Sequence, residues 1–126
     1  MHNIQKMPIR SHKQIDFYNR AYAASLTVHK LAQGLPKIEQ WVLADQMRRA
    51  SRSICANVAE GFSRGRESSQ EFKRFLQMAM SSAEEMQVWL DYCVDLGYVT
   101  ATHIDPIRQD YSEINKMIYA FKRNME

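Results

Sequence analysis

Residues 43–61, LADQMRRASRSICANVAEG, decide how the rest of the chain folds. At 100° per residue, the apolar side chains of this stretch form one stripe with the period of a packed helix. The stripe consists of Leu43, Met47, Ala50, Ile54 and Val58. The far side, where a surface helix is normally polar, mixes arginines with small and apolar residues. We therefore expect this helix to be covered twice, by its own domain and by something else.

Composition and periodicity place this helix in a bundle. The chain has 126 residues, 45% of them hydrophobic, with 4 Gly and 3 Pro, which favours one helical domain with one core. Helical periodicity covers residues 11–33, 37–60, 68–96 and 102–121. The short connections predict an all-α fold, an antiparallel up-down four-helix bundle. We expect a flexible N-terminal arm at 1–10 and a single domain at 11–126.

Capping residues mark several helix ends. Ser11 with Gln14 fits a capping box at the start of the first helix, and Ser68 begins the third helix in the same way. Gly61 is placed to end the second helix in the left-handed conformation, and Gly97 is placed to end the third helix.

The first helix carries two apolar stripes, and one helix cannot direct both at a single core. The first stripe holds Ile15, Tyr18, Tyr22, Leu26 and His29, and the second holds Phe17, Ala21, Ala24, Val28 and Leu31. Either this helix is central, or one stripe meets another subunit. We interpret His29 as a histidine at the edge of the core, bonded to a neighbour, rather than a metal ligand.

A polar flank of the 43–61 helix needs partners if it is half-buried. In an antiparallel helix pair, Arg49 would fall opposite Ser82 and Glu85. Glu60 would lie toward Arg74. Three interpretations stay open: a hydrogen-bond network between helices, a binding groove, and a catalytic site, although paired carboxylates are missing. The set consists of Gln46, Arg49, Ser53, Asn57, Glu60, Ser82 and Glu85.

Positive charge is concentrated in the first half of the chain. The net charge is only +3, but residues 1–66 hold eleven Lys or Arg against four Asp or Glu, whereas residues 67–100 hold two against six. The candidate phosphate-binding residues are Arg48, Arg49, Arg52, Arg64 and Arg66. Arginine forks match phosphate well, and such contacts bind without reading sequence. A solvated basic face is the alternative.

Other kinds of site find little support. Residues 61–65, GFSRG, match the G-x-S-x-G nucleophile elbow, but that motif needs a strand feeding the turn, so we expect no catalysis at Ser63. Cys55 and Cys93 lack metal-type spacing and are interpreted as small buried hydrophobes. We expect no catalytic residues, no metal and no cofactor. With no apolar run long enough to span a bilayer and no secretory signal, we expect a cytoplasmic protein without a membrane partner.

Apolar residues outside the expected core predict self-association, because large exposed patches usually mark interfaces. The candidate interface consists of Phe17, Val28, Leu31, Trp41, Ala56, Ala59, Val88 and Tyr92.

Two blocks of the sequence resemble a known family. Residues 46–61 follow the pattern QxRRAxxSIxxNxAEG, and residues 74–85 follow RFLxxAxxSxxE, with Gly97 and Tyr98 in an LGY turn. These blocks resemble the four-helix-bundle 23S rRNA intervening-sequence proteins. The resemblance implies a pentameric ring, as in the similar accessory proteins of diversity-generating retroelements, which bind nucleic acid and a reverse transcriptase. It also implies a ribosomal RNA precursor or a reverse transcriptase as the wider context.

The sequence therefore predicts a non-enzymatic, homo-oligomeric scaffold that binds nucleic acid, with structured RNA favoured over DNA. A protein–protein adaptor with an incidental basic face is the alternative.

Overall fold

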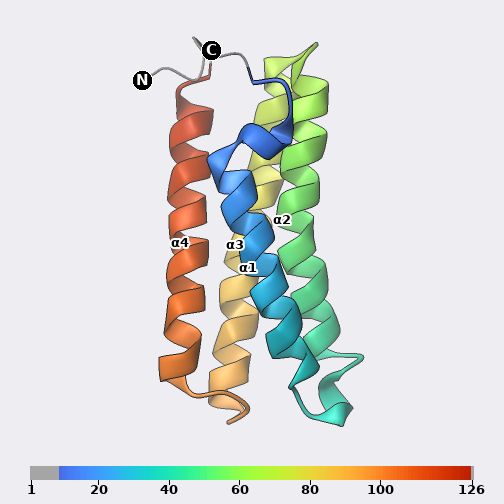
Figure 1. The fold of residues 1–126 in the computed structure, drawn as a ribbon, viewed down its shortest axis with the longest axis vertical. Coiled ribbons are helices and arrows are strands. Elements are labelled where there is room, and N and C mark those ends of the chain that lie inside the picture. The colour runs from blue at the N-terminus through green and yellow to red at the C-terminus, as the bar shows by residue number, and fades with distance from the viewer. Residues whose placement is uncertain (1–8, 126) are drawn as a thin grey trace.

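The computed structural model describes residues 9–125, which form a bundle of four long helices (Figure 1). The helices are α1 (Asp16–Gln33), α2 (Leu43–Gly65), α3 (Ser69–Asp95) and α4 (Ala101–Arg123). Successive helices run in opposite directions and pack side by side, α1 against α2 and α4, and α3 against α2 and α4. The predicted all-α, antiparallel up-down four-helix bundle is confirmed. Of the arm expected at residues 1–10, only Ile9 and Arg10 lie within the described residues.

Two short 3-10 helices precede α1 and α2, and they correct the predicted helix starts. The capping box of Ser11 and Gln14 is present, but it caps η1 (His12–Gln14), and Ile15 in an extended conformation separates η1 from α1. The second helix was expected from Lys37; η2 (Lys37–Glu39) lies there instead, and α2 starts at Leu43. Ser68 caps α3 as predicted, since its hydroxyl accepts a hydrogen bond from the backbone N–H of Glu71.

Gly61 has a role that differs from the prediction. Helix α2 continues through it to Gly65, so it is no C-terminal cap. A Cβ at Gly61 would lie 2.7 Å from Phe75 Cβ and 3.1 Å from Phe72 Cδ1. The glycine is therefore required because α2 and α3 approach each other closely at this point. Gly97, at a φ of +78°, does take the left-handed conformation after α3.

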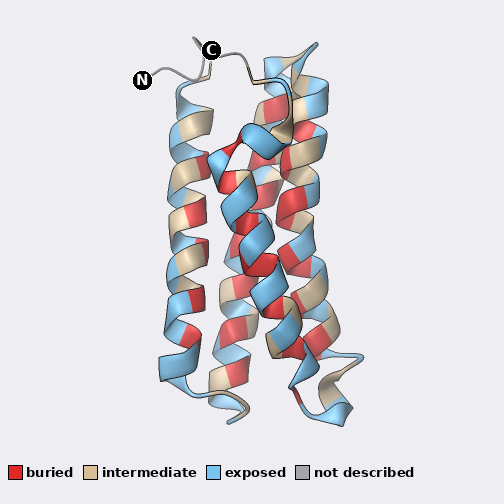
Figure 2. Cartoon of the chain, in the orientation of Figure 1, coloured by how far each residue is buried: buried red, intermediate tan, exposed pale blue. Residues whose placement is uncertain are grey.

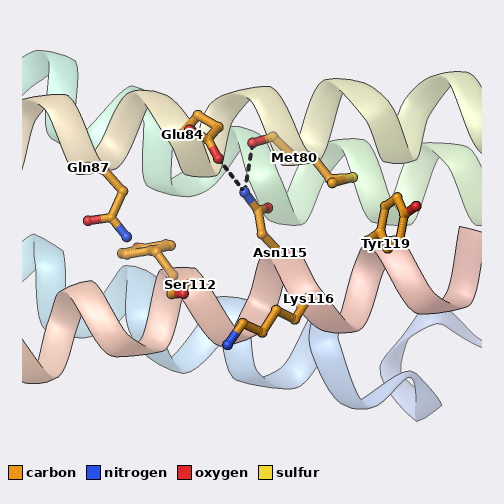
Figure 3. Close-up of a pocket in the computed structure, with 8 residues that line it drawn as sticks. Met80, Glu84, Gln87, Ser112, Asn115, Lys116 and Tyr119 are labelled. Atoms are coloured by element: carbon orange, nitrogen blue, oxygen red, sulfur yellow. Dashed lines mark hydrogen bonds between the residues drawn. The ribbon is translucent and has the colours of Figure 1, made fainter.

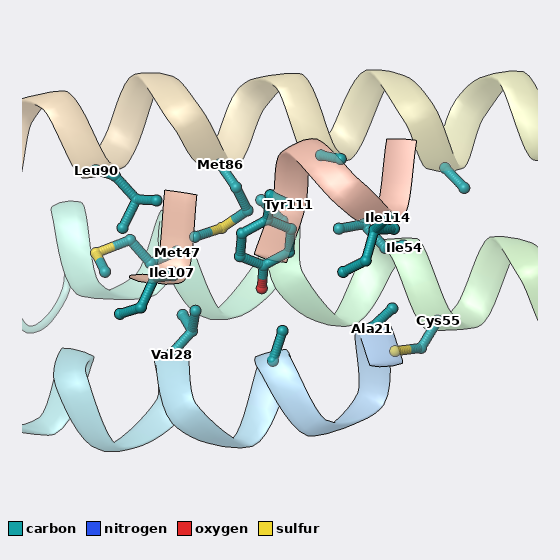
Figure 4. Close-up of a cluster of buried hydrophobic side chains, with 14 of the residues drawn as sticks. Ala21, Val28, Met47, Ile54, Cys55, Met86, Leu90, Ile107, Tyr111 and Ile114 are labelled. Atoms are coloured by element: carbon teal, nitrogen blue, oxygen red, sulfur yellow. The ribbon is translucent and has the colours of Figure 1, made fainter. Parts of the chain in front are cut away.

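The structure decides between the two stripes of α1. The second stripe faces the core, and Figure 4 shows Ala21 and Val28 among side chains from all four helices. Phe17 and Val28 are only 4% and 0% exposed, so placing them in an interface was wrong. Leu31 is half-buried and packs against the core.

The first stripe of α1 lies at its edge facing α2 and on the outside. Tyr18 and His29 are half-buried, whereas Tyr22 and Leu26 are exposed. Figure 2 shows exposed residues along the outer side of α1. One stripe of α1 therefore packs inside this chain, and the other is left with an unpartnered apolar part.

Both cysteines are buried thiols. Cys93 lies with its Sγ 3.6 Å from Met47 Sδ, and Cys55 lies at the α1–α2 contact. Burial raises the pKa of both thiols to about 11. This confirms their interpretation as small buried residues.

Candidate nucleic-acid interface

The five candidate arginines divide into two groups by their partners. In the first group, Arg49 Nε lies 2.9 Å from Asp45 Oδ2, and Arg64 Nε lies 2.8 Å from Glu60 Oε2. Both pairs join residues one turn apart on α2. Any phosphate that approached Arg49 or Arg64 would therefore compete with a carboxylate that is already in place.

The second group contacts no carboxylate within the described residues. Arg48 Nη2 donates to the backbone oxygen of Gln40 at 3.0 Å, and Arg66 Nη2 donates to that of Arg10 at 3.1 Å. Arg52 Nη2 lies 3.2 Å from His29 Nδ1. Since each guanidinium has five donor hydrogens, most of its donors stay available. We call Arg48, Arg52 and Arg66 the arginine row.

The arginine row follows the side of α2 that borders α1. At 100° per residue its members project within about 40° of one another. Arg52 touches α1 through His29, which is half-buried as interpreted from the sequence. Arg48 and Arg66 are separated by about 27 Å along the axis, at 1.5 Å per residue. The row is thus an extended track of positive charge rather than a compact cluster.

The polar flank of α2 faces α3 and is joined to it by hydrogen bonds. Ser82 Oγ donates to Ser53 Oγ at 3.0 Å across the two helices. Asn57 Nδ2 donates to the backbone oxygen of Ser53 at 2.9 Å and to its Oγ at 3.0 Å. Three of the seven expected network members are therefore connected, and they are satisfied by one another.

The other expected members bond elsewhere. Arg49 pairs with Asp45 instead of Glu85, and Glu60 pairs with Arg64 instead of Arg74. Neither of the two expected juxtapositions across the helices forms an ion pair, because a partner of opposite charge one turn away in the same helix is bound instead. Arg74 pairs with Glu71, and Glu85 accepts a hydrogen bond from Trp89 Nε1 at 3.0 Å. Gln46 is exposed.

Exposed apolar residues gather at one end of the bundle. Trp41 is 88% exposed, and Val88 and Tyr92 are also exposed, so these three members of the candidate interface lie on the surface of the single chain. The hydroxyl of Tyr98 donates to Glu39 Oε2 at 2.7 Å and so ties η2 to the turn after α3. We define the end patch as the exposed large hydrophobic residues of η2, the turn after it and the last turns of α3: Ile38, Trp41, Val42, Val88, Tyr92 and Leu96. Ala56 is exposed and Ala59 half-buried on the outer part of α2.

The surface of residues 9–125 also carries shallow grooves. One of about 330 Å³ lies between α3 and α4, where Asn115 Nδ2 donates to Glu84 Oε2 at 3.3 Å and to the backbone oxygen of Met80 at 3.4 Å (Figure 3). The second, of about 530 Å³, is lined by residues of the arginine-bearing end: Ile9, Arg10, Phe62, Gly65, Arg66 and Phe72.

Neither the GFSRG motif nor the acidic residues build a recognisable chemical centre. Ser63 lies inside α2, so the strand-fed turn of a nucleophile elbow is replaced by a helix. In residues 9–125, no cluster of His, Cys, Asp and Glu could hold a metal ion. No helix of that same range is long and apolar enough to cross a membrane.

Fold and surface together define a small up-and-down helical bundle with an arginine-bearing face. The profile of the 23S rRNA-intervening sequence proteins matches residues 13–120, so the chain belongs to that family. A crystal structure of a protein of unknown function from the S23 ribosomal protein family of Bacteroides thetaiotaomicron VPI-5482 has the same fold. Its TM-score is 0.78 at 24% identity, over 86% of this chain and 96% of the other. No curated protein matches the chain.

Proposed function

We propose that this protein is a non-enzymatic, homo-oligomeric scaffold of the cytoplasm that binds nucleic acid through backbone phosphates. The observation that carries the proposal is the arginine row, whose three guanidinium groups contact two backbone oxygens and one histidine ring, and no carboxylate, in the described part of the chain. A guanidinium group without a carboxylate partner binds phosphate more favourably than one that must first give up its carboxylate. The family's link to sequences that interrupt 23S rRNA favours structured RNA as the ligand.

The geometry of the row fits a polymer better than a small anion. Its members are spread along about 27 Å of α2, so a compact phosphate compound could engage only one or two of them. A nucleic-acid backbone presents phosphates at regular intervals and could meet all three. Three contacts would give a salt slope of about −2 to −3 for each subunit, and an oligomer would multiply that slope.

The test is fluorescence anisotropy of labelled RNA and DNA hairpins across a series of salt concentrations. Replacing Arg48, Arg52 and Arg66 by Gln should preserve the helical fold and flatten the salt slope by about 2 to 3 per subunit. The matched control replaces Arg49, Arg64 and Arg74 by Gln, which removes the same charge from ion-paired positions. Equal losses in the two variants, or no binding by the unmodified protein at low salt, would overturn the assignment.

For self-association we propose the end patch, because six large apolar side chains at one end of a monomer would otherwise meet water. Replacing Trp41 and Leu96 by Glu should reduce the mass measured by sedimentation, since both side chains would be buried in the assembly. Tyr119→Glu, on α4 and similarly exposed, is the control. An unchanged mass in the first variant would contradict this placement.

The end patch also favours one second candidate, an adaptor that binds another protein. An intact assembly that binds no RNA or DNA at any salt concentration would select that function over the first.

A further inference from the structure

We propose that the α1 border of the arginine row is a stacking platform for unpaired bases, so that the protein prefers single-stranded RNA segments to duplex. This inference rests on the proposed function and specifies its ligand. The platform consists of three rings, His12, Tyr18 and Tyr22.

The three rings form a continuous array along η1 and α1. The rings of His12 and Tyr18 meet edge to face, with centroids 4.6 Å apart. The rings of Tyr18 and Tyr22, one turn apart on α1, are nearly parallel, with an interplanar angle of 25° and centroids 6.2 Å apart. Tyr22, at the far end, is 51% exposed. An outside π-system can therefore stack at the Tyr22 end of rings that already support one another.

Positive charge lies at both ends of the array. Beyond Tyr22, two turns further along the same side of α1, His29 contacts Arg52. Before His12, the backbone oxygen of Arg10 accepts a hydrogen bond from Arg66. Two members of the arginine row thus bracket the aromatic rings, and a strand held at both points would pass over them.

Helix α2 leaves room for such a strand. Ala56 and Ala59 follow Arg52 by four and seven residues, which is one and two turns, toward Arg66. Ala56 is exposed and Ala59 is half-buried, so α2 presents only small side chains at these two positions between Arg52 and Arg66.

The charges near the array suit a polyanion. Burial raises the pKa of the Tyr18 hydroxyl, with smaller contributions from Cys55 and Tyr22, so this phenol stays neutral at physiological pH. The carboxylates of α2 nearest the row, Asp45 and Glu60, are held in ion pairs with other arginines. Proteins that bind single-stranded nucleic acid combine positive charge, which attracts the phosphate backbone, with exposed aromatic rings, on which any base can stack.

Unpaired bases are the occupant that these features favour over duplex. Protein side chains reach bases in RNA chiefly where loops and bulges leave them unstacked. A duplex would offer phosphates to the arginines but no free base to Tyr22. A second copy of the chain is the competing occupant of this face, and the experiment separates it.

The experiment compares Tyr22→Ala with Tyr119→Ala, since these tyrosines are 51% and 52% exposed and Tyr119 lies on α4, away from the row. Probes are a labelled single-stranded RNA and a blunt RNA duplex of equal length. Tyr22→Ala should weaken single-strand binding by about 5- to 150-fold, the range for loss of one stacked base, and leave duplex binding unchanged. Tyr119→Ala should bind as the unmodified protein does, and Tyr22→Phe, which keeps the ring, should retain full affinity.

Several results would overturn the platform. Unchanged single-strand affinity in Tyr22→Ala, with RNA binding otherwise intact, would refute it and leave the proposed function standing. A smaller assembly in Tyr22→Ala, with unchanged RNA affinity, would show that this face binds a second copy instead. Failure of the unmodified protein to bind either probe would refute the proposed function together with the platform.

Discussion

The two sides of α2 differ in how far they satisfy their own polar groups. Toward α3, Ser53 and Ser82 share a hydrogen bond, and Arg49 and Arg64 hold carboxylates. Toward α1, the arginine row contacts no carboxylate in the described part of the chain, and Tyr22 on α1 is exposed. The α3 side of the helix is therefore satisfied within the chain, whereas the arginines on the α1 side keep donors available for a ligand. Substitutions on the α3 side should change stability, and substitutions on the α1 side should change binding.

The largest effect is expected at the closest approach of α2 and α3. Gly61→Val should lower the free energy of unfolding by about 3 kcal/mol, because its side chain would overlap Phe75 and Phe72. Gly34→Ala is the control, since its Cβ would have an ordinary contact of 3.5 Å, and it should be neutral or stabilise by about 0.5 kcal/mol. Urea denaturation measures both. If the free energy of unfolding of Gly61→Val differed from that of the unmodified protein by less than about 0.5 kcal/mol, the close packing of α2 on α3 would be contradicted.

A smaller effect is expected from the serine pair. Ser82→Ala should cost about 1 kcal/mol of unfolding free energy, because it removes the donor to Ser53 Oγ. The double variant with Ser53→Ala should cost less than the two single losses together, since both changes remove one shared bond. Strict additivity in urea denaturation would show that the bond contributes nothing.

The smallest effect at neutral pH is expected from the thiols. Burial holds the folded-state pKa of Cys55 and Cys93 at about 11, above the value near 8.5 of an unfolded cysteine. Folding keeps these protons bound, so the contribution to stability is complete below about pH 8.5 and is lost as pH rises toward 11. Replacing both cysteines by Ala should flatten the alkaline decline in thermal midpoint between these pH values. An identical decline in that variant would assign it to other groups.

Periodicity and capping rules predicted the framework of the fold. The stripe of Met47, Ile54 and Val58 is fully buried, and the ends marked by Ser68 and Gly97 are where the sequence places them. These features are local, because helix period and cap chemistry depend on residues within a few positions.

The features that the sequence did not predict depend on contacts between residues far apart in the chain. Periodicity cannot rank the two stripes of α1, because both fit a helix equally well and only the neighbours decide. Gly61 fits a C-terminal cap in sequence, but α2 continues through it to Gly65, and the absence of a side chain instead leaves space for Phe75 and Phe72 of α3. The sequence could have predicted which arginines of α2 form ion pairs. Asp45 and Glu60 each lie four residues before an arginine, which is the spacing of ion pairs within a helix.

The most direct test is to compare the arginines on the α1 side of α2 with the ion-paired arginines of α2 and α3. The protein is treated with phenylglyoxal, with and without single-stranded RNA, and modification of each arginine is measured by mass spectrometry. If the α1 side binds, RNA will slow modification of Arg48, Arg52 and Arg66 and leave the rates at Arg49, Arg64 and Arg74 nearly unchanged. Protection that is equal across all six, or stronger at the ion-paired arginines, would contradict the assignment of binding to the α1 side.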